Sequence, residues 1–112
     1  MKAITPRPLK IKAWNMQTKL MMRLDSVDCV KGELRKRDHV LLQFTGFCDA
    51  EGAELYDNDV FLIGSQKHLI CWVDNGWYYK SMEAEEGVFP LSSAIAGSGK
   101  RLCNCYEVSI EP

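Results

Sequence analysis

The sequence has few of the residues that build metal centres or disulfide scaffolds. Its 112 residues include two histidines and five cysteines, and no two cysteines form a C-x-x-C pair. A zinc finger or disulfide framework needs paired, regularly spaced ligands, so neither is indicated. Neither His39 nor His68 has a spacing that ties it to a cysteine, although a redox or metal role stays open for the closely spaced Cys103 and Cys105. We therefore expect no cofactor or metal, and reduced thiols at Cys29, Cys48, Cys71, Cys103 and Cys105.

Long apolar runs are also missing. No stretch approaches the roughly 18–20 apolar residues of a membrane span. Residues 1–14 carry positive charges without the apolar core of a signal peptide. These features predict a cytoplasmic protein without membrane contact. A content of 46% hydrophobic and 26% charged residues is ordinary for a globular protein, so we expect one folded domain over residues 1–112.

Little net charge remains overall, but the two signs are unevenly distributed. The formal net charge is −1. Residues 1–40 hold ten Lys or Arg against four Asp or Glu, a balance of +6, whereas residues 41–112 hold four against eleven, a balance of −7. Such halves can neutralise each other within one domain. They can also associate head to tail between copies, or the basic half can bind an anionic partner.

Residues 10–24 have the pattern of a β-hairpin. Lys10, Lys12 and Trp14 alternate with Ile11 and Ala13, which is typical of a strand with two different faces. A polar turn at 15–18 and an apolar stretch at 20–24 complete the predicted hairpin.

Residues 25–38 are ambiguous, because a short helix and a strand followed by a loop both fit. This segment ends in the charge cluster Arg35-Lys36-Arg37. A solvated surface is the simpler interpretation of the cluster. A contact to a phosphate backbone is the alternative.

The rest of the chain reads as short strands separated by turns. We predict that Gly46 ends a buried strand at 40–45 and that Asn75-Gly76 forms a hairpin turn across which Trp72 meets the Trp77–Tyr79 stretch. Residues 91–99 are predicted to be a flexible surface loop. The fold is therefore expected to be mainly β with little helix, a small antiparallel barrel or strongly bent sheet. Its expected parts are the hairpin at 10–24, an SH3-like, barrel-like core at about 40–80, further strands at 60–63 and 68–73, and a closing strand at 101–110.

Residues 41–63, LLQFTGFCDAEGAELYDNDVFLI, resemble the signature of the YopX-like phage and prophage family, approximately Q-[YF]-T-G-x-x-D-x-x-G-x-x-[IL]-Y-E-G-D-[IV]. Asp57-Asn58 departs from the usual Glu-Gly, and asparagine is expected to tolerate the unusual φ of that corner. The resemblance implies a phage or mobile-element origin, a mostly β fold and self-association, and it implies no reaction or catalytic residue. The positions in register are Gln43, Phe44, Thr45, Gly46, Asp49, Gly52, Leu55, Tyr56, Asp59 and Val60.

The acids of this motif have two interpretations. Asp49, Asp57 and Asp59 could bind a cation or act as acid and base if they converge. Turn formation explains them more simply, because Asp-x-x-Gly favours turns and no histidine or serine accompanies the acids at a defined spacing.

These observations lead to one functional hypothesis and two alternatives. We expect a non-enzymatic, self-associating interaction module that binds its own copies and a host or phage protein. Nucleic-acid binding and the sequestration of a nucleotide-like ligand by aromatic side chains are the alternatives. The expected contact residues are Lys31, Arg35, Lys36, Arg37, Trp72 and Trp77.

Overall fold

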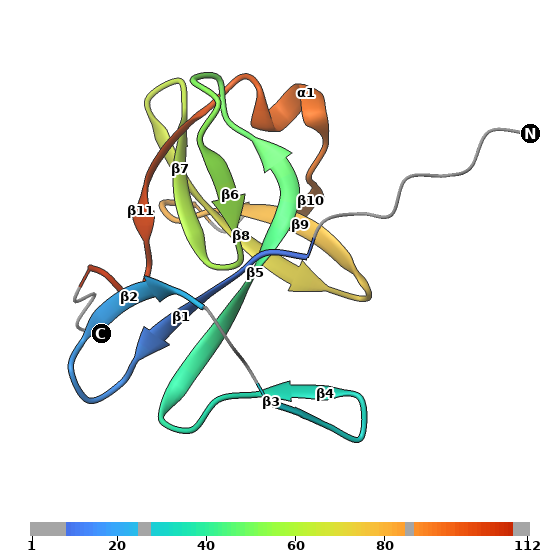
Figure 1. Cartoon of the computed structure of the whole chain (residues 1–112). Coiled ribbons are helices and arrows are strands. Elements are labelled where there is room, and N and C mark those ends of the chain that lie inside the picture. The colour runs from blue at the N-terminus through green and yellow to red at the C-terminus, as the bar shows by residue number, and fades with distance from the viewer. Residues whose placement is uncertain (1–8, 25–27, 85–86, 109–112) are drawn as a thin grey trace, which may run out of the picture.

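The computed structural model describes residues 9–24, 28–84 and 87–108, which form eleven strands and one short helix (Figure 1). The mainly β fold is as predicted. The four-stranded N-terminal sheet has the order β2 (Leu20–Arg23), β1 (Ile11–Asn15), β5 (His39–Cys48) and β6 (Glu54–Tyr56). The five-stranded sheet curls into a half-barrel and has the order β10 (Val88–Pro90), β9 (Gly76–Ser81), β8 (Gln66–Val73), β7 (Asp59–Ile63) and β11 (Lys100–Asn104).

The predicted N-terminal hairpin is confirmed as β1 and β2. The side-chain oxygen of Asn15 accepts hydrogen bonds from the backbone N–H groups of Gln17 and Thr18, at 2.9 and 3.1 Å, and so closes the turn. The predicted alternation also holds: the Lys12 Nζ lies 4.4 Å from the centre of the Tyr56 ring, and the Trp14 ring lies 6.2 Å from that of Tyr106. One face of β1 is thereby directed at the second half of the molecule.

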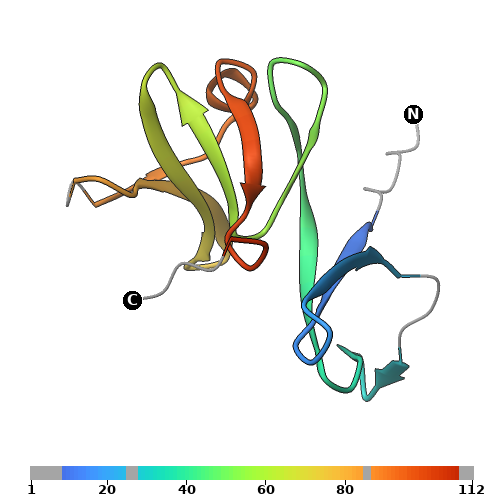
Figure 2. The same cartoon turned by 90° about the vertical axis from the view of Figure 1, so that its left-hand side faces the viewer.

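Gly46 does not end a strand, contrary to the prediction. The ten-residue β5 continues through it to Cys48, with φ +92° at Gly46 and a register shift against β6 between Phe44 and Cys48. The buried Thr45 hydroxyl supports the irregularity, since it donates to the Leu55 carbonyl at 2.8 Å and accepts from the Phe47 N–H at 3.0 Å. The glycine allows a β-bulge, through which β5 runs along much of the molecule to the turn shared with β6 (Figure 2).

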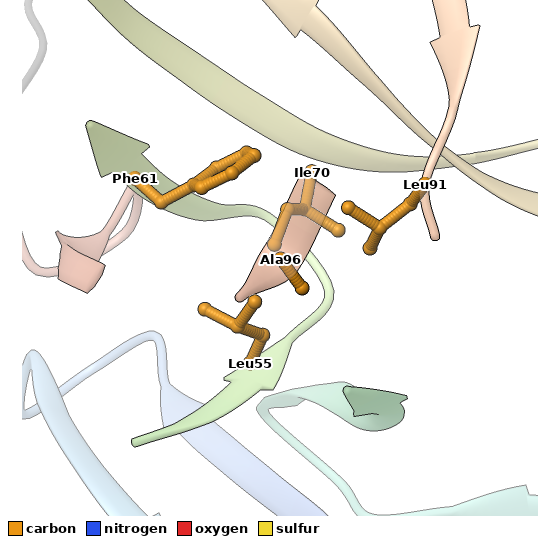
Figure 3. Packing of buried hydrophobic residues seen from close by; sticks show 5 residues of the cluster. All are labelled: Leu55, Phe61, Ile70, Leu91 and Ala96. Carbon is orange, nitrogen blue, oxygen red and sulfur yellow. The ribbon is translucent and has the colours of Figure 1, made fainter. Parts of the chain in front are cut away.

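The segment at 91–99 is not simply a surface loop, because it contributes Leu91 and Ala96 to the core. It contains α1 (Ser93–Ala96), whose N-cap Ser92 accepts a hydrogen bond from the Ile95 N–H at 3.2 Å. Gly97 and Gly99 suggested a loop, but the apolar residues before them pack into the core cluster or against it. The buried cluster consists of Leu55, Phe61, Ile70, Leu91 and Ala96 (Figure 3).

The ambiguous segment forms a hairpin of β3 (Asp28–Val30) and β4 (Glu33–Arg35), so the helix alternative is wrong; residues 25–27 lie outside the described residues. Its two-residue turn has φ +52° at Lys31 and +84° at Gly32.

The β8–β9 turn is shifted by one residue from the prediction. Val73 pairs with Gly76, so Asp74 and Asn75 are central, with φ +47° and +65°. Both turns have the positive φ angles that suit the twist of a hairpin.

The closing strand is shorter than predicted. β11 ends at Asn104, where the chain turns and the Glu107 N–H donates to the Asn104 carbonyl at 3.0 Å. Residues 109 and 110 of the expected strand lie outside the described residues. At the corner where Asp57-Asn58 replaces the usual Glu-Gly, Asn58 adopts the expected positive φ, +64°. Within the described ranges, no helix is long and apolar enough to cross a membrane.

Candidate functional site

Asp49 organises the turn between β5 and β6. Its carboxylate accepts hydrogen bonds from the backbone N–H groups of Glu51 (2.9 Å), Ala53 (2.8 Å) and Arg101 (2.7 Å). Burial alone would raise the pKa of Asp49, but these backbone donors and the Arg101 charge hold that pKa below its usual value. Gly52, with φ +85°, lets the chain return within this turn. The motif acid therefore ties the turn to the start of β11.

Asp59 is fully buried and forms the centre of a second network. Its carboxylate accepts from the Tyr56 N–H at 2.8 Å, from the Arg101 guanidinium at 2.9 and 3.3 Å, and from the Asn104 side-chain amide at 3.0 Å. Burial would lower the pKa of Arg101, but Asp59 and then Glu107 raise it above its usual value. These contacts hold the corner before β7 against the end of β11. The carboxylates of Asp49 and Asp59 therefore both stabilise the fold.

The other motif residues lie around the same bulge and turns. The Phe44 and Tyr56 rings are 5.5 Å apart, and both side chains are buried. Gln43 is exposed, and its backbone carbonyl accepts from the Asp57 N–H at 2.9 Å. Thr45 and Gly46 build the bulge described above. The motif thus defines backbone geometry.

The β3–β4 hairpin, here called the arm, is attached to the outer end of the N-terminal sheet (Figures 1 and 2). All its strand residues are exposed, including Val30 at 50% and Leu34 at 43%. A groove of about 620 Å³, the arm groove, lies between the arm and the start of β5. Its lining combines apolar and basic side chains: Asp28, Val30, Leu34, Arg35, Lys36, Arg37, His39 and Leu41.

The predicted basic cluster lies on this arm and directly after it. Arg35 pairs with Glu33, but both side chains are about two-thirds exposed, at 67% and 66%, so the pair contributes little. Lys36 forms no ion pair with any other described residue. Lys31 lies at the tip of the arm. The arm groove is consequently lined by both basic and apolar side chains. Val30 and Leu34 lie on opposite faces of the arm, because their cross-strand partners are Glu33 and Cys29.

Trp72 and Trp77 form the expected cross-strand pair, edge to face with ring centres 4.8 Å apart. Tyr79 and Phe89 extend this apolar strip across β9 and β10, with ring centres 5.8 Å apart. Cross-strand partners point to the same face of a sheet, so these four side chains lie on one face, here called the aromatic end. Trp77 and Tyr79 are half-buried there and pack against the core cluster. Trp72 is 50% exposed and Phe89 44%. The exposed acids Asp74 and Glu83 lie next to its strands in the sequence.

A third feature, the inter-sheet groove, was missed by sequence reasoning. It has a volume of about 550 Å³. Alternation in β1 placed Lys10 and Lys12 on one face, but nothing in the sequence indicated that Arg23 and Arg101 would join them. Its lining is mostly polar and basic: Lys10, Lys12, Arg23, Gly52, Ala53, Glu54, Tyr56 and Arg101.

Fold and surfaces together define a small, curled β protein. Its motif acids Asp49 and Asp59 are engaged in turns, and its surface carries two grooves with basic lining residues and the partly exposed aromatic end. Comparison with protein families gives a match over residues 10–109 to the family described as YopX protein. The chain belongs to this family, which is associated with phages and prophages.

Comparison with solved structures supports the fold. The crystal structure of protein EF1440 from Enterococcus faecalis is similar, with a TM-score of 0.65 over 91% of this chain and 96% of that chain. The two sequences are 15% identical, so the likeness concerns the fold alone. No curated protein matches the sequence.

Proposed function

We propose that this protein is a non-enzymatic, self-associating interaction module in which the arm of one copy docks on the aromatic end of the next. The observation that carries the proposal is the arm itself. A two-stranded hairpin is marginally stable in water unless it packs against another surface. Here both strands are exposed from end to end, and apolar Val30 and Leu34 are open to solvent.

Charge supports a second copy as the partner. Residues 9–24 and 28–48 carry eight Lys or Arg against three Asp or Glu, a balance of +5. Residues 49–84 and 87–108 carry four against eight, a balance of −4. The basic side chains that line the arm groove and the acids beside the aromatic end are therefore complementary, and each surface offers exposed apolar side chains.

The two surfaces differ, so the contact is heterologous. Such a contact closes into a ring or continues as a filament, depending on the rotation between copies. Both surfaces are also open to a host or phage protein of similar chemistry. Family membership supports an origin of this chain in a phage or mobile element and a site of action in the bacterial cytoplasm.

The test is the molar mass of the full chain by light scattering over a range of protein and salt concentrations. We expect association that grows with protein concentration and weakens with salt. Val30→Ser combined with Leu34→Ser should abolish it. The matched control is Leu102→Ser, since Leu102 has a similar exposure, 41%, and lines neither surface. A monomeric wild type at every concentration would refute the proposal.

Nucleic-acid binding is a second candidate, favoured by the exposed, weakly paired cations of the arm. Fluorescence anisotropy with labelled DNA and RNA at about 50 mM salt tests it. Binding that is lost on Arg35→Ala with Arg37→Ala supports this candidate, and the absence of binding at that salt concentration excludes it.

A further inference from the structure

Two cations lie directly opposite each other in the N-terminal sheet. Lys12 of β1 is the cross-strand partner of Arg23 of β2, so both side chains point to the face that borders the inter-sheet groove. Like charges at such positions destabilise a sheet. Neither side chain forms an ion pair with another described residue. An anion bound between the two cations would relieve their mutual repulsion.

The carboxylates around this pair are already engaged. Glu54 is bound to Lys10. Asp59 and Glu107 both bind the Arg101 guanidinium, at 2.9 and 3.3 Å. Lys10 and Arg101 are thus paired, and the four cations with these three carboxylates leave a net charge of +1 around the groove.

Two opposing influences act on the charge of Lys12. Its ammonium lies over the Tyr56 ring, which is a favourable cation–π contact. Burial lowers its pKa, as do the charges of Arg101 and Arg23, and this lowering exceeds the opposing influence of Asp59 and Glu107. A bound anion would relieve this unfavourable electrostatic environment.

We propose that the inter-sheet groove binds a compact, doubly charged oxyanion, the phosphate group of a small phosphomonoester or free phosphate, between Lys12 and Arg23. Its volume of about 550 Å³ lies within the usual range for small-ligand sites. The planar guanidinium of arginine matches two phosphate oxygens, and a lysine ammonium adds a point charge.

The groove suits a small phosphate better than a nucleic acid. The Tyr56 ring beneath Lys12 belongs to a residue that is only 2% exposed, so it offers no face for stacking a base. Glu54 lines the groove, and Glu107 is bound to Arg101 in its wall. These carboxylates would repel a long polyanion that continued past the two cations.

Isothermal titration of the full chain with inorganic phosphate and with glycerol phosphate tests the site, with sodium chloride at matched ionic strength as reference. We expect one bound phosphate per chain. Lys12→Met, which keeps the aliphatic stem over Tyr56, and Arg23→Gln should each weaken binding by at least about tenfold. Lys80→Met, an exposed lysine of β9, is the charge-matched control and should bind as the wild type does.

Thermal melts without phosphate establish that each variant is folded. If Lys12→Met does not fold, Arg23→Gln alone tests the site. Equal affinity for the two ligands indicates that the phosphate group alone is recognised, and tighter glycerol phosphate binding indicates further contacts; both outcomes support the site. Absence of phosphate-specific binding by the wild type would overturn it, as would unchanged affinity in both groove variants. The site is independent of self-association, so its failure leaves the proposed function untouched.

Discussion

Replacing Asp59 by alanine should destabilise the fold more than any other change to a motif acid. The substitution removes the acceptor for the Tyr56 N–H, the Arg101 guanidinium and the Asn104 amide. It also leaves the partly buried Arg101 without its main partner. Breaking a buried pair from one side costs about 3–5 kcal/mol. At roughly 4 °C per kcal/mol for a domain of this size, the melting temperature should fall by about 12–20 °C.

The matched control is Asp57→Asn, two residues away in the same corner. Burial, followed by the nearby Asp59 charge, raises the pKa of Asp57 against the hydrogen bond from Asn58. Its ionised form is therefore disfavoured in the folded state, and the neutral amide should change the free energy of unfolding by no more than about 0.5 kcal/mol. Urea unfolding followed by circular dichroism measures both variants.

A double variant separates electrostatic pairing from lost packing. Asp59→Leu with Arg101→Met removes both charges, so it should cost less than the sum of the single changes by about 1–3 kcal/mol. Strict additivity would contradict the proposed coupling. So would an Asp59→Ala variant that is no less stable than Asp57→Asn.

Three further predictions concern acid sensitivity, packing and association. The folded pKa of Asp49 is lowered, so its contribution to stability is present above its unfolded pKa, near 3.8, and is lost as the pH falls through the folded pKa. In urea titrations, the stability difference between wild type and Asp49→Asn should therefore shrink as the pH is lowered below about 4. A Cβ atom at Gly99 would lie 2.7 Å from the Phe61 ring and 2.9 Å from the Leu62 carbonyl oxygen, so Gly99→Ala should lower the free energy of unfolding by about 1–3 kcal/mol in urea. Trp72→Ala should cost only about 1 kcal/mol in the same assay yet reduce the molar mass seen by light scattering; unchanged association would count against the aromatic end.

Local patterns were sufficient to predict two of the hairpins, β1–β2 and β8–β9, but not the arm. Alternation in residues 10–14 identified β1 and its two faces, and the tryptophan pairing followed from the turn between Trp72 and Trp77. Gly46 was misread because a glycine that ends a strand and one that allows a bulge look alike in sequence. The distinction depends on Thr45, whose hydroxyl bonds to Leu55 ten residues away.

The grooves could be predicted only in part. The basic cluster at the end of β4 and just after it was visible as a run of charge, but its place beside Val30 and Leu34 in the arm groove depends on how the arm folds. The inter-sheet groove needs β11 to bring Arg101 to Asp59, 42 residues earlier in the chain. Strand order and register decide that contact, and a single sequence does not specify them. The same holds for the opposition of Lys12 and Arg23.

Mixing two variants that are each blocked on one surface tests association through the arm and the aromatic end most directly. One variant carries Val30→Ser and Leu34→Ser, and the other carries Trp72→Ser and Phe89→Ser. Each keeps the surface that the other lacks, so each should be monomeric alone, and an equal mixture should form a species of two chains and nothing larger. A mixture that remains monomeric, under conditions where the wild type associates, would contradict docking of the arm on the aromatic end.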